Sequence, residues 1–358
     1  MKPIAISVLL FLVIGCGTAD QKGEANEETK PEARIKLTRN DAEKKVDVMI
    51  DGKFFTSYIY PESIKKPVLF PLLTASGKTL TRGFPLDPQP WERIDHPHHV
   101  GMWLNHGDTD GLDFWNNSDA RPENQRAHYG TIFHKSIEKV KSGDDYGFLE
   151  VSAEWKRPDG RVILEENTQY YFRGSEGRRI IDRITTLTAP DLNVLFKDSK
   201  EGMMAIRVNR AMELPGESTI EVLDENLKPV EAKVSDGNRS RGHYLNSEGV
   251  EGPGVWGQRA RWVRLGSDID NEAVGIIIMD HPENPNHPTH WHAREYGLFS
   301  ANPFGSQAYT GGAETFNFFL PVKESVTLKY RVMIYNAVEP ADSVIDSEYE
   351  QFASMFSN

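Results

Sequence analysis

The sequence has little of three things: cysteine, clustered basic charge and long apolar runs. Its 358 residues include a single cysteine, Cys16, so no disulfide can form within one chain. Lys and Arg number 41 against 53 Asp and Glu, and the basic residues form no run, which excludes a nucleic-acid partner because phosphate binding needs a concentrated basic surface. After Cys16 no apolar run reaches the length that spans a bilayer. With 38% hydrophobic and 26% charged residues, the composition is that of a folded globular protein.

The N-terminal segment "MKPIAISVLLFLVIGCG" has the features of an export signal. A lone lysine precedes an apolar stretch too short to cross a membrane, and the segment ends in "VIGC", which resembles the bacterial lipobox. We therefore expect residues 1–16 to be a lipoprotein signal peptide with Cys16 lipidated. Residues 17–34 contain almost no large apolar side chain and are expected to be a disordered acidic tether. These features predict a protein of the cell envelope, attached to the outer membrane through lipid alone, on its periplasmic or surface face.

Residues 35–358 are expected to form a single β-sandwich domain. Short runs rich in β-branched and aromatic residues alternate with turn residues, as in "FLEVSAEWKRPDGRVILEENTQYYF", where Pro-Asp-Gly joins two extended segments. This pattern predicts an all-β fold, a large antiparallel β-sandwich with a short C-terminal helix. The helix is indicated by apolar residues at helical spacing behind Asp342 as a candidate cap, namely Ile345, Tyr349, Phe352 and Phe356. The ending "FFLPVKESVTLKYRVMIYN" is similar to the closing strands of galactose-mutarotase-like supersandwich proteins, which implies carbohydrate chemistry.

The segment "RIDHPHHVGMWLNHGDTDGLDFWNN", residues 93–117, holds four histidines, four aspartates and two tryptophans. The residue before Pro97 is driven to extended backbone angles, and alternate residues of an extended segment share a face. His96 and His98 are therefore expected on one side, with His99 on the other. The glycines that follow allow the chain to present several oxygen and nitrogen ligands together.

A second segment, "DHPENPNHPTHWHAREYGLFSANPFG" at residues 280–305, has four more histidines. Eight of the eleven histidines thus lie in two segments nearly two hundred residues apart in the chain. We expect the two segments to meet in one pocket. A third polar segment, "FKDSKEGMMAIRVNRA" at residues 196–211, is a candidate third wall of this pocket through Arg207, which can bind a carboxylate or pair with Asp198.

Three uses of these residues stay open. Each histidine can be a structural hydrogen-bonding group; alternatively imidazoles and carboxylates act as general acid and base, or they hold one divalent metal. The candidate acid and base residues are His98, His99, His290, His292, Glu295 and Asp95. The candidate substrate-binding residues are Trp103, His106, Arg207, Trp291 and Arg294, in which the indole rings offer flat faces to a sugar. The candidate metal ligands are His96, His98 and His292, although neither segment has a diagnostic metal-binding spacing.

Several motifs together resemble a bacterial family known as PmoA-like. They are "KKPVLFPLLTASGKTLTRGFP", "DHPHHVGMWLNHGDTDGLDFW", "DSKEGMMAIRV", "GQRARWVRLG" and "HPENPNHPTHWHAREYGLFSANPFG", which cover most of residues 58–335. The family usually has arginine where this chain has Val100, so an anion-binding role of that arginine is absent here. The resemblance implies export by polysaccharide-degrading bacteria, and the family label implies a metal-dependent oxidoreductase.

These observations lead to one principal hypothesis and two alternatives. The principal hypothesis is an exported lipoprotein that acts on a carbohydrate or sugar acid through a histidine-rich pocket, as a hydrolase, lyase or epimerase. The first alternative is a carbohydrate-binding lipoprotein without catalytic activity. The second is the metal-dependent oxidoreductase. The density of histidine favours an enzyme, because a binding module relies on exposed aromatic and amide groups.

Overall fold

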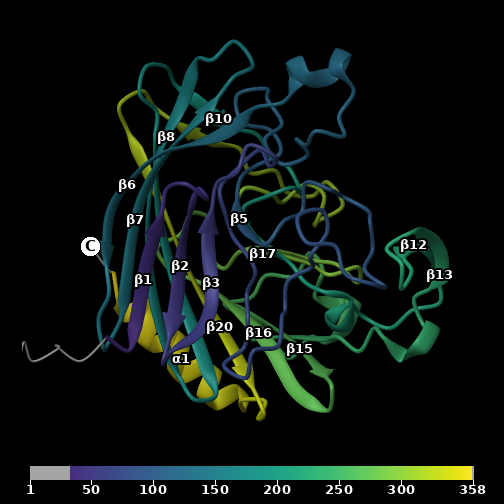
Figure 1. Cartoon of the computed structure of the whole chain (residues 1–358). Coiled ribbons are helices and arrows are strands. Elements are labelled where there is room, and N and C mark those ends of the chain that lie inside the picture. Colours follow the sequence, from purple (N-terminus) through teal and green to yellow (C-terminus); the bar gives the residue numbers. More distant parts are fainter. Residues whose placement is uncertain (1–32, 357–358) are drawn as a thin grey trace, which may run out of the picture. The chain divides into compact units, whose positions relative to one another are not determined.

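Residues 33–356 are described by the structure, a computed structural model, and they are built around two large antiparallel β-sheets (Figure 1). The expected signal peptide, Cys16 and nearly all of the expected tether lie outside these residues. Among the described helices, none has the length and apolar character needed to cross a membrane. The first sheet has the strand order β1-β2-β3-β4-β5-β11-β18-β17. Its strands are β1 (Ile35–Asn40), β2 (Lys45–Ile50), β3 (Lys53–Ile59), β4 (Val68–Leu69), β5 (Met102–Leu104), β11 (Met204–Arg207), β18 (Leu298–Asn302) and β17 (His290–Ala293).

The second sheet has the strand order β14-β15-β16-β20-β9-β8-β7-β6 and contains the long hairpins. Pro158, Asp159 and Gly160 lie in the turn between β7 and β8, as the sequence predicts. The strands are β14 (His243–Asn246), β15 (Trp262–Ile269), β16 (Glu272–Asp280), β20 (Ser325–Asn336), β9 (Arg178–Thr188), β8 (Val162–Ser175), β7 (Gly147–Lys156) and β6 (Thr131–Lys141).

Short elements lie between and around the two sheets. Two small antiparallel pairs are β10 (Val194–Phe196) with β19 (Phe318–Leu320), and β12 (Thr219–Leu223) with β13 (Pro229–Lys233). The short 3-10 helices are η1 (Glu123–His128), η2 (Arg210–Met212), η3 (Asp236–Asn238) and η4 (Gly252–Val255), and the α-helix of the described residues is α1 (Asp342–Ser354).

The two sheets pack face to face through apolar side chains that alternate along their strands. In β7 buried and partly buried residues alternate, which places every second side chain in the core. The ring of Phe55 in β3 meets that of Phe172 in β8 at a centroid distance of 6.4 Å, and Tyr58 meets Tyr170 at 6.1 Å. These contacts join the sheets into the β-sandwich that the alternation predicts, and the predicted fold class is confirmed.

The C-terminal helix covers the outer face of the second sheet. Ile345, Tyr349 and Phe352 of α1 are buried against apolar residues of β9, β15, β16 and β20. The residue before the helix is Ala341, which makes no side-chain cap, so the expectation that Asp342 caps the helix is wrong. Asp342 lies in the first turn instead, where its negative charge interacts favourably with the positive end of the helix dipole.

Candidate functional site

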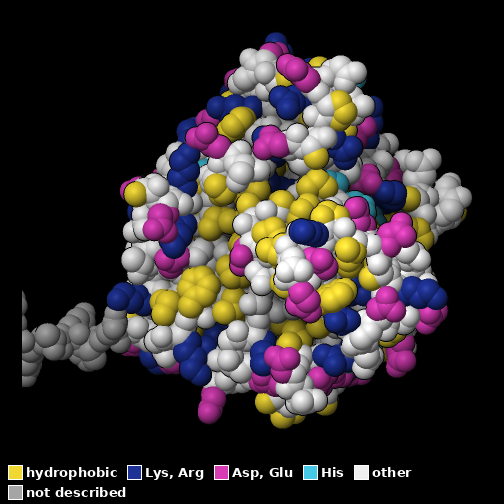
Figure 2. Space-filling model, turned by 45° about the vertical axis from the view of Figure 1, so that its right-hand side comes forward, with side chains coloured by type: hydrophobic (Ala, Val, Ile, Leu, Met, Phe, Trp, Pro, Cys, Tyr) yellow, Lys and Arg dark blue, Asp and Glu magenta, His cyan; other side chains and the backbone are white. Residues whose placement is uncertain are grey.

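The outer face of the first sheet, at the strands β5, β11, β18 and β17, carries most of the predicted site residues. Antiparallel register places Trp103, Ala205, Ser300 and His292 opposite one another in a row across these four strands. Their sequence neighbours, such as Trp291, point to the other side and belong to the core between the sheets. We call this outer surface the histidine face. Figure 2 shows histidine side chains in cyan at the surface beside a recessed area, with acidic and basic side chains around them.

Asp95 stands at the edge of the histidine face between two buried arginines. Its Oδ1 accepts hydrogen bonds from Nη1 of Arg82 at 2.8 Å and from Nη2 of Arg207 at 2.7 Å. The side chains of Arg82 and Arg207 are 1% and 0% exposed. Burial alone would raise the pKa of Asp95, but its contacts with His96, Arg207 and Arg82 outweigh burial and hold the pKa well below its usual range. The Asp95 carboxylate is therefore ionised at neutral pH.

Arg82 also determines the path of the histidine-rich loop. Its guanidinium donates to the main-chain carbonyls of Asp95 at 2.7 Å, His96 at 2.9 Å and His99 at 3.1 Å. His96 has a φ of 44°, in the left-handed region, and its carbonyl accepts a hydrogen bond from the amide of His99 at 2.9 Å. The chain thus turns at His96, so the expectation of an extended segment with His99 on the opposite side is wrong. The carbonyl contacts of one buried guanidinium override the local preference of the residue before proline.

The turn brings the three imidazoles of this loop together. His96 stacks on His99 with a centroid distance of 4.8 Å and on Tyr296 with 5.1 Å, at interplanar angles of 2° and 3°. His99 in turn stacks on Trp103 at 5.4 Å, and the edge of His98 meets His99 at 4.3 Å. The outermost of these imidazoles is His96, whose side chain is 40% exposed and whose Nδ1 lies 3.2 Å from Oδ2 of Asp95.

His98 and His99 are neutral and enclosed. Burial lowers the pKa of His98 to about 2 and lowers that of His99 well below its ordinary value. The Nδ1 of His99 lies 3.3 Å from an Nη atom of Arg207, which can only donate, so this Nδ1 carries the lone pair and Nε2 the proton. His98 lies beside Lys66, whose ammonium donates to the His98 carbonyl at 2.6 Å. Burial lowers the pKa of Lys66 to about 7, so this buried ammonium beside the loop can change charge near neutral pH.

The histidines of β17 are neutral and have defined tautomers. The Nδ1 atoms of His290 and His292 lie 2.8 Å and 2.7 Å from the carbonyls of Gly257 and Lys200, so each Nδ1 is protonated and each Nε2 carries a lone pair. Burial lowers both pKa values, that of His292 to about 3. The Nε2 of His290 is closed off from solvent, whereas that of His292 is not among the enclosed, unpartnered atoms of the described residues. His292 is itself only 3% exposed, and its Nε2 carries the lone pair that faces away from the carbonyl of Lys200.

The two histidine-rich segments meet on this face where His96 of the first stacks on Tyr296 of the second. Burial is the main cause that lowers the pKa of His292, followed by the positive charges of Lys200 and Arg294. Arg294 follows β17, and its guanidinium lies 5.6 Å from the ring of Tyr296, on which His96 is stacked. Glu295, the predicted carboxylate of this segment, is exposed in the turn between β17 and β18. The Asp95–His96 pair, the neutral imidazole of His292 and the guanidinium of Arg294 thus lie on one side of the first sheet.

Three other residues that the sequence predicts for the site are buried in the structure, namely Trp291, Trp103 and His106. Trp291 is 0% exposed, and its indole donates to the carbonyl of Ala260 at 3.0 Å inside the core. Trp103 is also 0% exposed at the base of the imidazole stack, so neither ring offers a free face to a sugar. His106 is buried between Phe196 and Phe304, and its Nε2 lies 2.7 Å from the carbonyl of Lys197.

The other two histidines of the second segment belong to the C-terminal region of the fold. His281 lies 3.1 Å from the carbonyl of Met355, and His287 lies 2.8 Å from the carboxylate of Asp280. Within residues 33–356 no three His, Cys, Asp or Glu side chains are arranged to hold a metal ion. His96, His98 and His292 are therefore not gathered as a set of metal ligands.

The sequence reasoning missed Arg82, Lys66 and Tyr296. Arg82 stands in the motif "TLTRGFP", which has no charge pattern or spacing that marks a functional arginine. Lys66 precedes a proline and looks like a surface lysine, yet it is 4% exposed. Only the folded chain shows that these groups surround the histidine loop.

The chain matches, over residues 45–349, a family described as "Family of unknown function (DUF6807)". Nothing indicates the PmoA-like family, so the resemblance drawn from the motifs is wrong, and the oxidoreductase alternative that rested on its label has no support. No curated protein sequence matches the chain.

Solved structures similar to the chain include several proteins with names from carbohydrate chemistry. A putative aldose 1-epimerase of Escherichia coli K12 has 10% identity and a TM-score of 0.36, with 84% of this chain and 98% of that chain covered. A galactose mutarotase-like protein of Clostridium acetobutylicum has 11% identity and a TM-score of 0.37, with 86% and 100% covered. An α-galactosidase of glycoside hydrolase family 36 from Geobacillus stearothermophilus has 13% identity and a TM-score of 0.37, with 84% of this chain but only 40% of that enzyme covered. Structural similarity at these TM-scores does not indicate the activity of this chain.

Proposed function

The chain belongs to the family of unknown function DUF6807, and from its own residues we propose that it is an exported enzyme that transfers protons on a carbohydrate or sugar acid. The observation that carries the proposal is the presence on one face of the sheet of two imidazoles in different states: His292, neutral with its lone pair on Nε2, and His96, held by the ionised carboxylate of Asp95. Such groups can act as base and acid in one reaction.

The chemistry follows from the protonation states. His292 accepts a proton from a hydroxyl or an acidic carbon of the substrate through Nε2, because its Nδ1 proton is bound to the carbonyl of Lys200. His96 donates a proton to an oxygen of the same substrate, and the Asp95 carboxylate stabilises the imidazolium before that transfer. Arg294 supplies a positive charge beside Tyr296 for negative charge that develops on the substrate.

This arrangement favours an epimerase or lyase over a hydrolase. Most glycosidases place two carboxyl groups on either side of the bond they cleave. Here Oδ1 of Asp95 is occupied by two arginines, and Glu295 is exposed on a turn. The two imidazoles of His96 and His292 remain as the candidate proton-transfer groups, and they suit proton transfer at the anomeric centre or next to a carboxylate.

The export and the lipid anchor are part of the proposal and rest on the sequence before residue 33. The lipobox-like "VIGC" makes Cys16 the lipidated residue, and the acidic segment 17–34 is the tether between the membrane and the folded part. We propose the cell envelope as the location, with the chain attached to the membrane only through lipid.

The test is proton exchange followed by nuclear magnetic resonance. The purified protein is incubated in deuterated buffer with a panel of aldoses and uronic acids, and both anomer interconversion and exchange of carbon-bound hydrogen are recorded. We expect acceleration of one of these for at least one sugar, with loss of at least 100-fold in His292→Gln and His96→Gln, since general acid and base groups contribute about 10²–10⁴-fold. His128→Gln is the matched control because His128 is exposed on η1. Full activity of both site variants would refute the proposal.

A binding role without catalysis is favoured by one separate feature. A cavity of about 580 Å³ is lined by Tyr60, His134 and Phe133, of which Phe133 is 51% exposed. Exposed aromatic side chains are what a carbohydrate-binding surface needs. Binding of a sugar without any proton exchange, weakened by Phe133→Ala and not by His292→Gln, would establish this alternative in place of the enzyme.

A further inference from the structure

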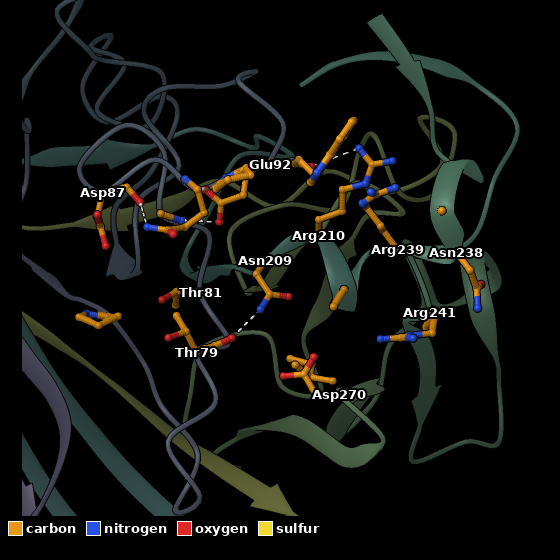
Figure 3. A pocket seen from close by; sticks show the side chains of 18 of the residues that line it. Thr79, Thr81, Asp87, Glu92, Asn209, Arg210, Asn238, Arg239, Arg241 and Asp270 are labelled. Carbon is orange, nitrogen blue, oxygen red and sulfur yellow. Dashed lines mark hydrogen bonds between the residues drawn. The ribbon is translucent and has the colours of Figure 1, made fainter. Parts of the chain in front are cut away.

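A cavity of about 620 Å³ lies apart from the histidine face, between the loop around residues 79–92 and the segment around residues 237–241 (Figure 3). Arg210, Arg239 and Arg241 stand along one side of it, and Thr79, Thr81 and Asp87 along the other. None of its lining residues belongs to the two histidine-rich segments. Its volume lies in the range of pockets that hold small organic ligands.

The three arginines have no carboxylate within hydrogen-bond distance among the described residues. Arg210 donates to the main-chain carbonyls of Trp91, Lys233 and Val234, at 3.0 to 3.3 Å. Arg239 donates to the main-chain carbonyl of Asp236 at 3.1 Å. The carboxylate nearest to Arg241 is that of Asp268, at 3.8 Å.

The acidic residues at the cavity are largely engaged elsewhere. Glu92 accepts hydrogen bonds from the main-chain amides of Gly83 at 2.7 Å, Phe84 at 3.1 Å and Gln89 at 3.2 Å. Asp270 pairs with the ammonium of Lys78 at 2.6 Å. Asp87 is exposed on the far wall. On the side formed by the arginines, Arg241 has one long ion pair with Asp268 at 3.8 Å, whereas the guanidinium of Arg239 has no carboxylate partner among the described residues.

These arginines are held in place before any ligand arrives. Arg210 is 5% exposed, and its Nε, like that of Arg241, is closed off from solvent and has no partner. The guanidinium of Arg239 lies 4.1 Å from the ring of Trp91, whose indole donates to Glu225 at 2.6 Å. A guanidinium stacked on an indole loses little freedom when it binds, because its plane is already fixed. The cavity is therefore preorganised for an anion.

We propose that this cavity binds a carboxylated or sulfated saccharide through Arg239 and Arg241, with Arg210 as the buried positive charge behind them. Guanidinium groups bind carboxylate and sulfate oxygens with two parallel hydrogen bonds. The neutral side chains of Thr79, Gln89 and Asn238 at the rim suit hydroxyl groups of the same ligand. This binding does not depend on the proton-transfer proposal, because the two sites share no side chain.

The wall between the two sites is one short segment of chain. Thr81 and Gly83 line the cavity, while Arg82 between them points to Asp95 on the other side. A Cβ added at Gly83 would meet the carbonyl of Asp87 at 1.9 Å, so the loop closes tightly at this point. The cavity and the Asp95 carboxylate thus lie on opposite sides of this loop.

Titration calorimetry with the purified full chain tests the proposal, with D-galacturonate, galactose 6-sulfate and the neutral match D-galactose as probes. We expect at least one charged probe to bind with one-to-one stoichiometry and at least 10-fold more tightly than D-galactose. Binding of only one charged probe identifies the anion as carboxylate or sulfate. Failure of both charged probes, or equal binding of D-galactose, would overturn the proposal.

Two arginine variants locate the binding. Arg239→Gln and Arg241→Gln should each weaken the charged probe at least 10-fold, and either one suffices if the other fails to fold. Arg161→Gln, at an exposed residue of the β7–β8 turn, is the control and should bind as the unaltered protein does. His292→Gln should also retain this binding, so loss of catalysis and loss of the arginine site are distinguishable. Unchanged affinity in both arginine variants would place the ligand elsewhere and refute the assignment.

Discussion

Replacing Asp95 by asparagine should cost much of the stability of the histidine loop. The carboxylate accepts hydrogen bonds at 2.7 and 2.8 Å from two arginines that are 0% and 1% exposed. Removing one partner of a buried ion pair costs about 3–5 kcal/mol, because the remaining charge is left uncompensated. The Asp95 side chain is 33% exposed, so water screens part of the loss, and we expect about 2–3 kcal/mol.

A double-mutant cycle with Arg207→Met separates the charge from the packing. Asp95→Asn leaves both Arg82 and Arg207 without this carboxylate, whereas the double variant removes one of the two guanidinium groups together with it. We therefore expect Asp95→Asn with Arg207→Met to cost less than the sum of the single changes by about 1–2 kcal/mol. Urea unfolding followed by intrinsic fluorescence measures all four proteins. Asp145→Asn, at an exposed residue, is the control and should change the free energy of unfolding by less than about 0.5 kcal/mol. A cost below about 1 kcal/mol for Asp95→Asn, or an additive cycle, would show that Asp95 is not the counter-charge of the loop.

Three further predictions concern acid stability, the core and the anchor. Burial holds the pKa of His98, His106 and His292 at about 2, 4 and 3, below the value of about 6.5 expected in the unfolded chain. Below pH 6.5 the unfolded state therefore binds more protons than the folded state. The free energy of unfolding should decrease as the pH is lowered, by up to about 1.4 kcal/mol per pH unit for each group. Thermal midpoints measured between pH 7.5 and 5 should drop accordingly, and a flat profile contradicts this. Trp291→Ala should lower the free energy of unfolding by about 3–5 kcal/mol and leave sugar affinity unchanged, since the ring is wholly buried. Reduced sugar affinity in the folded variant would show that Trp291 belongs to the binding site. Cys16→Ser should release the protein from membranes in a fractionation assay, and retention after a high-salt wash would exclude lipid as the anchor.

The strands were predictable because their alternation is local information. In the β7–β8 hairpin, the turn residues and the period of two are both visible in the sequence, and each follows from sterics between near neighbours. The C-terminal helix was predictable for the same reason, since Ile345, Tyr349 and Phe352 recur at helical spacing and are buried as a stripe. Its first residue was less certain from sequence because the capping position is held by Ala341 without a side-chain contact.

The details of the site were not predictable, because they depend on groups that are distant in the chain. The turn at His96 is fixed by Arg82, which reaches three carbonyls of the loop, and no local rule contains that interaction. Equally, the sequence does not show that Trp291 points into the core while its neighbour His292 points out, since this depends on which face of β17 meets the second sheet. Histidine density indicated the region correctly as polar and crowded, but it did not distinguish His292 from His281, which contacts the C-terminal segment.

The order of the strands under the histidine face has a consequence for folding kinetics. The neighbours β5, β11 and β18 begin at residues 102, 204 and 298, so each pairing closes a loop that contains much of the chain. Pairings of such high contact order form slowly, because the entropy of loop closure is lost before the contacts are gained. During synthesis β1, β2 and β3 can pair early as local hairpins, while β5 waits for β11, which emerges about a hundred residues later. On refolding from denaturant, strand content should therefore recover before the histidine face does, and a chain shortened before residue 290 would never build it.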